Sequence, residues 1–93
     1  MEWRSYDPAW LVALAREAMP DAPWLADALA QCTRASLESR AYLHFVDPSR
    51  ANEPGSPWQF AESVVIHHAR EGDLVLDVLK DGRIGGVEFL GRV

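Results

Sequence analysis

The stretch that decides the fold is Gly72-Asp-Leu-Val-Leu-Asp-Val-Leu-Lys-Asp-Gly-Arg-Ile-Gly-Gly-Val-Glu-Phe-Leu90. Apolar and polar residues alternate in it on both sides of Asp81-Gly82, a dipeptide typical of tight turns between antiparallel strands. A two-residue turn at this dipeptide places Lys80 opposite Arg83 and Leu76 opposite Val87. The sequence therefore predicts a β-hairpin with strands at about 73–79 and 83–90.

This register gives the predicted hairpin two different faces, because residues that oppose each other share a face. The first face is apolar and is expected to lie beneath helices; it carries Leu74, Leu76, Val78, Val87 and Phe89. The second face mixes aliphatic and acidic residues; it carries Val75, Asp77, Leu79, Ile84 and Glu88. A carboxylate is costly to bury alone, so we expect solvent, a further layer or a partner to meet the second face.

Two more strands are predicted upstream, at about 59–68 and 42–46, with a surface loop rich in Pro and turn-forming residues at 47–57. The turn that leads into 73–79 can be read in two ways. An odd-numbered loop, Arg70-Glu71-Gly72, pairs Ile66 with Leu76 and sends His67 to the mixed face, whereas an even-numbered loop reverses the faces. We favour the odd-numbered loop because it buries more apolar surface.

The residues before these strands predict two helices. Asp7-Pro8 supplies a helix start, and Met19-Pro20 ends that helix because the residue before Pro avoids the α conformation. A second helix is expected at about 22–37, with Cys32 on its apolar face. The predicted fold is therefore α+β in a single domain, 1–93: an N-terminal αα-hairpin (about 7–38) packs on a three- or four-stranded, mainly antiparallel β-meander (about 41–91).

The composition excludes several classes of protein. Lys and Arg total 9 against 14 Asp and Glu, a net charge of −5, which argues against direct binding of nucleic acid. The single Cys32 cannot form an intramolecular disulfide, which fits a reducing cytoplasm, and no stretch approaches the ~20 apolar residues of a membrane span. We therefore expect a cytoplasmic protein that does not contact membranes.

Few residues are arranged for chemistry. Neighbours such as His67 and His68 point to opposite faces of a strand, and the chain lacks the Cys and His spacings of metal sites, so no metal or cofactor is expected. Gly85-Gly86 lies within the hairpin, where it allows a close approach of another backbone or a bulky side chain, or marks a bulge. His67 shares the mixed face with Asp77 and Glu88 and could serve there as a general base. We favour a partly exposed histidine on an acidic face.

The chain also has four tryptophans, of which Trp24 fits the core side of a helix, whereas Trp10 and Trp58 either fill the core or are exposed for recognition. If the mixed face binds a partner, its acids and aliphatic residues would make the contact. The candidate partner-binding residues are Asp77, Glu88, Glu62, Val75, Ile84, Trp58 and His67.

The segment 72–90, with its Asp-Gly turn followed by Gly-Val-Glu-Phe-Leu, resembles the closing hairpin of small bacterial proteins, some of them antitoxins. The two-helix front followed by a β-meander is similar to immunity proteins of contact-dependent growth inhibition systems. This resemblance implies a non-enzymatic protein that binds and neutralises a cognate toxin, commonly a basic nuclease domain. Two alternatives stay open: a small hydrolase or nucleic-acid-processing enzyme that uses His67 with Asp77 or Glu88, and a homodimer that closes its sheet face on itself. The expected state is a monomer or a weak homodimer.

Overall fold

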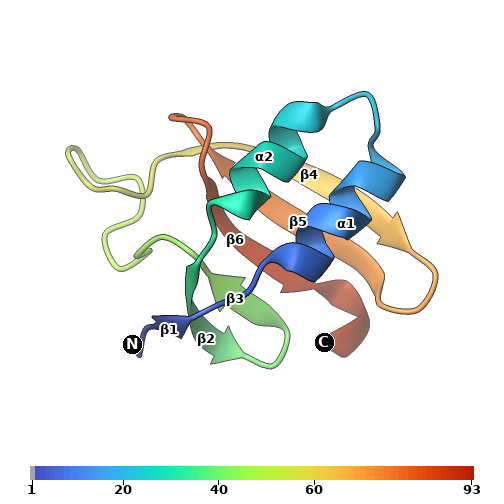
Figure 1. The fold of residues 1–93 in the computed structure, drawn as a ribbon. Helices are drawn as coiled ribbons and strands as arrows, with labels where there is room; N and C mark the ends of the chain where they lie inside the picture. Colours follow the sequence, from blue (N-terminus) through green and yellow to red (C-terminus); the bar gives the residue numbers. More distant parts are fainter. Residues whose placement is uncertain (1) are drawn as a thin grey trace.

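The computed structural model of the protein describes residues 2–93 and consists of two helices and six strands, all paired antiparallel (Figure 1). The helices are α1 (Ala9–Ala18) and α2 (Pro23–Ala30), and a short 3-10 helix, η1 (Leu90–Arg92), follows the last strand. The strands are β1 (Arg4–Ser5), β2 (Arg34–Ser39), β3 (Tyr42–His44), β4 (Phe60–His68), β5 (Gly72–Leu79) and β6 (Ile84–Phe89). Both helices lie on the same side of the sheet, which confirms the α+β class with N-terminal helices.

The sheet has more strands than predicted and is not a simple meander. Its strand order is β1-β2-β3-β6-β5-β4, so chain order is kept within β1 to β3 and within β4 to β6, but β3 is followed in space by β6 and β4 lies at the far edge. The prediction of three or four strands was wrong because two short strands, β1 and β2, extend the sheet beyond β3. None of the helices within residues 2–93 is long and apolar enough to cross a membrane.

The second helix is shorter than predicted. It ends at Ala30, and residues 34–39, part of which was expected to be helical, form β2. Cys32 lies beyond the helix, but its thiol still reaches back to the carbonyl oxygen of Ala28 at 3.6 Å. The apolar helical spacing in the sequence therefore continued past the end of the helix, and pairing with β1 and β3 fixed the next residues as a strand.

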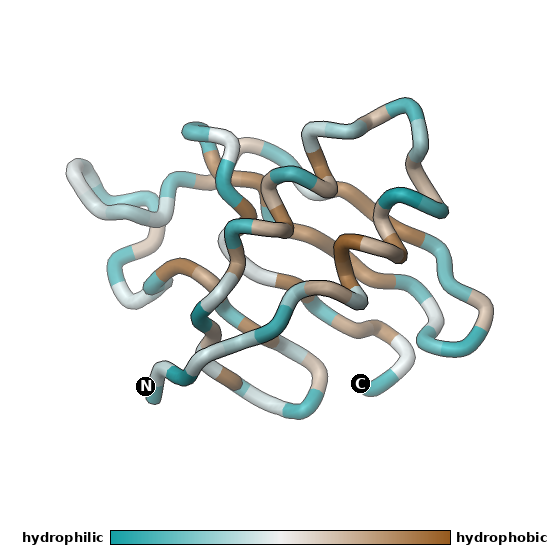
Figure 2. Tube along the Cα trace, in the orientation of Figure 1, coloured by the Kyte–Doolittle hydropathy of each residue, from teal (hydrophilic) through white to brown (hydrophobic). Residues whose placement is uncertain are grey.

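The main core lies between the helices and the sheet. All five residues of the predicted apolar face are buried: Leu74, Leu76, Val78, Val87 and Phe89. The helices contribute Leu11, Leu14, Leu25 and Leu29 to the same cluster. Figure 2 shows this distribution along the chain, with hydrophobic residues in the central strands and the helices and hydrophilic residues in the loops. The apolar residues that alternate along the strands and those spaced regularly along α1 and α2 therefore pack together in one apolar layer.

The hairpin between β5 and β6 follows the predicted register over only part of its length. Val75 pairs with Glu88 and Asp77 with Gly86, as predicted, but the register then shifts and Val78 pairs with Ile84. The two-residue turn was wrong: Leu79 N–H donates to Arg83 O at 2.8 Å, which leaves a three-residue loop. A type I′ turn requires a positive φ at both of its central residues. Gly82 has a φ of 89°, but Asp81 does not have a positive φ.

The turn between β4 and β5 has the predicted odd length but begins one residue earlier. His68 pairs with Gly72, so the loop consists of residues 69–71, and Gly72 has a φ of 76°. Ile66 therefore pairs with Leu74 and not with Leu76. A shift of two residues leaves every side chain on its predicted face, so Ile66 still enters the core and His67 still points away from the helices.

Candidate partner-binding face

The side of the sheet turned away from the helices has an open part and a covered part. Its open part, here called the outer face, is formed by the strand positions that alternate with the core residues of β3 to β6, together with Glu38 of β2. It consists of Glu38, Tyr42, His44, Ser63, Val65, His67, Asp73, Val75, Asp77, Gly86 and Glu88. The covered part lies at the other end of the sheet, where the chain that follows the loop 47–57 packs over the strands.

Trp58 belongs to the covered part. It is buried and forms a second, small core with Val46 and Leu79. The extra residue of β6, Gly85, lies beneath its ring: a Cβ atom there would lie 2.6 Å from Trp58 Nε1 and 2.9 Å from Leu79 Cδ2. The bulge in β6 and the indole above it therefore form one packing unit, and Trp58 fills a core.

Trp10 and Trp24 do not contribute to the outer face either. Trp10, on α1, is 39% exposed, stacks on Phe89 with ring centroids 5.7 Å apart, and donates its Nε1–H to Tyr6. Trp24, on α2, is 44% exposed, so its assignment to the core side of the helix was wrong. Both lie on the helical side of the molecule.

Tyr42 and Asp77 are joined across the outer face by a hydrogen bond from the tyrosine hydroxyl to Asp77 Oδ2. Gly86 lies between them in the sheet, and a Cβ atom there would lie 2.7 Å from Leu43 O and 3.0 Å from the Tyr42 ring. The glycine therefore lets the phenol ring cross β6. Burial, followed by the hydrogen bond to Asp77 and the nearby carboxylates, raises the pKa of Tyr42 above its ordinary value.

His44 is the most enclosed charged or ionisable residue of the outer face, with 5% of its surface exposed. Its Nε2 atom lies 3.1 Å from Glu38 Oε1, and its ring lies 4.5 Å from the ring of Tyr42. Neither Tyr42 nor His44 was among the candidate residues. The one sequence signal for them was Gly85-Gly86, which predicted that another backbone or a bulky side chain lies close to β6 but did not identify which residue it is.

His67 has a different partner from the one expected. Its Nδ1 atom lies 2.7 Å from Asp73 Oδ1, because His67 and Asp73 oppose each other in the β4–β5 ladder. The two side chains are 80% and 45% exposed. The expected grouping of His67 with Asp77 or Glu88 was therefore wrong at the level of contacts, and His67 and Asp73 form a solvent-facing pair.

Two other candidate residues lie on the helical side. Ile84 pairs with Val78 and is 1% exposed in the main core, because the bulge at Gly85 reverses the faces of the residues before it. Glu62 pairs with Val78 and alternates regularly with Val64 and Ile66, so it lies on the helix-facing side of β4. Ile84 was placed wrongly because alternation alone does not reveal a bulge, whereas the position of Glu62 follows from the regular alternation of β4 and separates it from Asp77 and Glu88.

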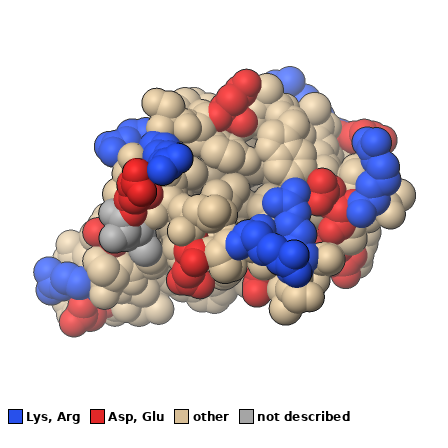
Figure 3. Space-filling view, turned by 90° about the horizontal axis from the view of Figure 1, so that it is seen from below, with Lys and Arg blue, Asp and Glu red and all other residues tan. Residues whose placement is uncertain are grey.

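The remaining candidates, Val75, Asp77 and Glu88, do lie together on the outer face. Val65 and Val75 oppose each other at its centre, Asp73 and Asp77 flank Val75 along β5, and Glu88 opposes Val75 from β6. The outward positions of β3 to β6 contain no Lys or Arg in the part of the chain that the structure describes. Figure 3 shows a different pattern on the side of the molecule seen from below the view of Figure 1, where acidic and basic side chains are mixed.

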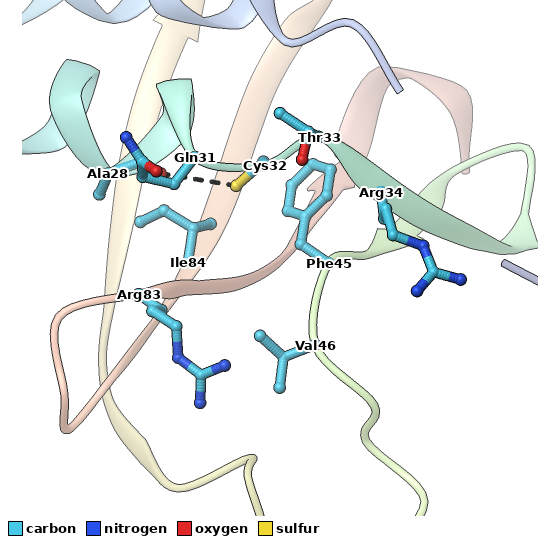
Figure 4. Close-up of a pocket in the computed structure, with 9 residues that line it drawn as sticks. All are labelled: Ala28, Gln31, Cys32, Thr33, Arg34, Phe45, Val46, Arg83 and Ile84. Atoms are coloured by element: carbon cyan, nitrogen blue, oxygen red, sulfur yellow. Dashed lines mark hydrogen bonds between the residues drawn. The ribbon is translucent and has the colours of Figure 1, made fainter. Parts of the chain in front are cut away.

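A recess lies elsewhere, between the end of α2 and strands β3 and β6 (Figure 4). It has a volume of about 240 Å³, and its residues are Ala28, Gln31, Cys32, Thr33, Arg34, Phe45, Val46, Arg83 and Ile84. Arg83 is held by Asp81 at 2.7 Å and by the carbonyl oxygen of Pro57 at 3.0 Å. Within residues 2–93, no group of three or more His, Cys, Asp or Glu is placed to hold a metal ion.

Cys32 gives the protein a predictable response to alkaline pH. Burial raises the pKa of its thiol from 9.0 to about 12, so the unfolded chain loses this proton at a lower pH than the folded chain. The contribution of the protonated thiol to the free energy of unfolding is complete below pH 9 and is lost as the pH rises from about 9 to about 12. We expect the free energy of unfolding, measured with denaturant from about pH 8 to pH 11, to fall over this range, and to fall less steeply in Cys32→Ala. Equal slopes in the two proteins would contradict this assignment.

Chemically, the outer face offers an apolar centre surrounded by carboxylates, which suits contact with a basic surface. No protein-family model, no curated protein and no solved structure matches the chain.

Proposed function

We propose that this chain is an immunity protein: a non-enzymatic binding protein that neutralises a toxin domain, a basic nuclease, by forming a stoichiometric complex with it. The observation that carries the proposal is the outer face, where Asp73, Asp77 and Glu88 surround a valine pair and no cation lies among the outward positions of β3 to β6. The resemblance of segment 72–90 to antitoxin and immunity-protein hairpins supports the same function.

The composition of the outer face suits a basic protein partner. Val65 and Val75 would give the apolar centre of an interface, and long Lys and Arg side chains can pack their aliphatic stems on such residues while their charged ends reach carboxylates. Asp77 is held by Tyr42, and such fixed carboxylates lose less conformational freedom when a partner binds. The net charge of −5 would also accelerate encounter with a basic domain.

The proposal includes the place of action. A protein that protects a cell from a nuclease has to meet the toxin before the toxin reaches nucleic acid, which points to the cytoplasm. One buried cysteine without a disulfide is compatible with that reducing compartment.

A nuclease titration tests the proposal. A candidate nuclease toxin domain, chosen from the genes next to the one that encodes this chain, is purified. Its nuclease activity is measured against increasing amounts of this protein, and the two are also mixed on a sizing column. We expect activity to end at one equivalent of the protein and a 1:1 complex to elute. Full nuclease activity at a tenfold excess of the protein would overturn the proposal.

The same titration separates binding from catalysis. If the protein were instead a hydrolase or nucleic-acid-processing enzyme that uses His67, a small fraction of one equivalent would inactivate all of the toxin or degrade its substrate over time. His67→Ala would then abolish this turnover. If the protein only binds the toxin, the molar ratio at which nuclease activity is lost does not change with the time of incubation.

A further inference from the structure

Strand β4 forms one edge of the sheet. Within residues 2–93 it pairs with β5 on one side, and no strand pairs with its other edge. The strand is nine residues long, Phe60–His68, and contains no Pro, Lys or Arg. Exposed edges of this length are normally shortened, bent or protected by charges, because their free N–H and C=O groups can pair with another strand. The opposite edge of the sheet differs, since β2 is partly covered by the two-residue strand β1.

The sequence of β4 is complementary to itself. If two copies pair antiparallel about a two-fold axis through Val65, perpendicular to the sheet, residues whose numbers sum to 130 oppose each other. Val65 then meets Val65, Val64 meets Ile66, and Glu62 meets His68. This axis keeps equivalent faces on the same side, so each contact is between residues that already share a face.

The alternative registers match less well. Centring the axis on Val64 places the Glu62 carboxylate opposite the apolar Ile66, and centring it on Ile66 places Val64 opposite His68. Cross-strand pairs stabilise a sheet when apolar residues meet apolar residues and a carboxylate meets a donor. The Val65-centred register is the one of these three that satisfies both conditions.

His68 is prepared to donate to such a carboxylate. Its Nδ1 atom accepts the backbone N–H groups of Arg70 and Glu71, at 3.3 Å and 3.0 Å. A neutral imidazole whose Nδ1 accepts carries its proton on Nε2. Nε2–H is therefore the donor that the Glu62 carboxylate of a second copy would meet.

From this edge we propose that two copies of the chain pair through their β4 strands and form one continuous antiparallel sheet. Val65, 45% exposed, lies on the axis. The helices of both copies then lie on one side of the joined sheet and both outer faces lie on the other. This pairing uses the strand edge and leaves the outer face free, unlike a dimer that closes the face on itself, and it does not depend on the proposed function.

Sedimentation equilibrium of the purified protein tests the dimer. We expect a monomer–dimer equilibrium whose dissociation constant rises at least about tenfold in Val65→Lys, because two like charges then oppose each other on the axis. Leu37→Lys is the matched control: Leu37 is 63% exposed in β2, away from the β4 edge, and its replacement is expected to leave the equilibrium unchanged. A wild-type protein that stays monomeric at high micromolar concentration would overturn the proposal, as would a dimer that Val65→Lys leaves intact.

Disulfide cross-linking tests the register. In Val65→Cys the two new thiols would face each other across the axis, with Cα atoms about 4.5–5.5 Å apart, within the range for a disulfide. In Ala61→Cys the two thiols would be separated by eight residue positions, or about 27 Å. Mild oxidation is expected to link Val65→Cys and neither Ala61→Cys nor the wild type, whose Cys32 is buried. Linkage of Ala61→Cys without linkage of Val65→Cys would refute the register.

Discussion

Replacing Phe89 by alanine is expected to lower the free energy of unfolding by about 3–5 kcal/mol. Phe89 has no exposed surface and opposes Leu74 at the centre of the main core. Trp10 stacks on its ring, and the guanidinium of Arg92 lies 4.1 Å from the ring centroid. Truncation therefore opens a cavity and also removes the surface on which α1 and η1 pack. For a domain of this size the loss is a large share of the total stability.

Leu90→Ala is the matched control for this measurement. Leu90 is the next residue along the chain and is 44% exposed, so its truncation is expected to cost less than about 1 kcal/mol. Both variants are compared with the wild type by urea denaturation. Equal losses in the two variants, or a loss below about 1 kcal/mol for Phe89→Ala, would show that the ring does not anchor the helical layer.

Removing the charge of the outer face is expected to slow capture of the toxin domain about ten- to a hundredfold at low ionic strength. The variant combines Asp73→Asn, Asp77→Asn and Glu88→Gln and keeps the shape of all three side chains. Complementary charges act mainly on the association rate, and salt screens them. Stopped-flow measurements at several salt concentrations are therefore expected to show a slower association with a weaker dependence on salt.

A variant with the same net charge separates the face from the overall charge. Glu17→Gln, Asp21→Asn and Asp27→Asn remove three exposed acids from the helices and the turn between them. This control is expected to slow association much less than the outer-face variant. Equal slowing in both variants would mean that net charge alone governs capture and would remove the outer face from the proposal.

The parts of the fold that follow from local alternation were predictable, and the parts that depend on distant contacts were not. The apolar face of the hairpin was predicted because Leu74, Leu76 and Val78 recur at every second residue of their strand. Ile84 was misplaced because the bulge at Gly85 belongs with the indole of Trp58, far away in the sequence. Likewise, β2 was missed because its partners, β1 and β3, determine it more than its own residues do.

The candidate site shows the same division. Val75, Asp77 and Glu88 were placed correctly on the outer face because they lie in the regular part of the hairpin. Tyr42 and His44 were missed because they reach this face through the β3–β6 pairing, which joins residues more than 40 positions apart. No periodic pattern in a single segment reports such a contact.

The central position of β6 has a consequence for how this chain folds during synthesis. Among the six strands of residues 2–93, β6 is the last to leave the ribosome, yet it lies between β3 and β5 and joins the two groups of strands on either side of it. A nascent chain without β6 therefore exposes two incomplete groups of strands, each with an unsatisfied edge, and cannot close the core beneath α1 and α2. Closure of the sheet has to wait until β6 has been synthesised, which makes the acquisition of structure a late, all-or-none event.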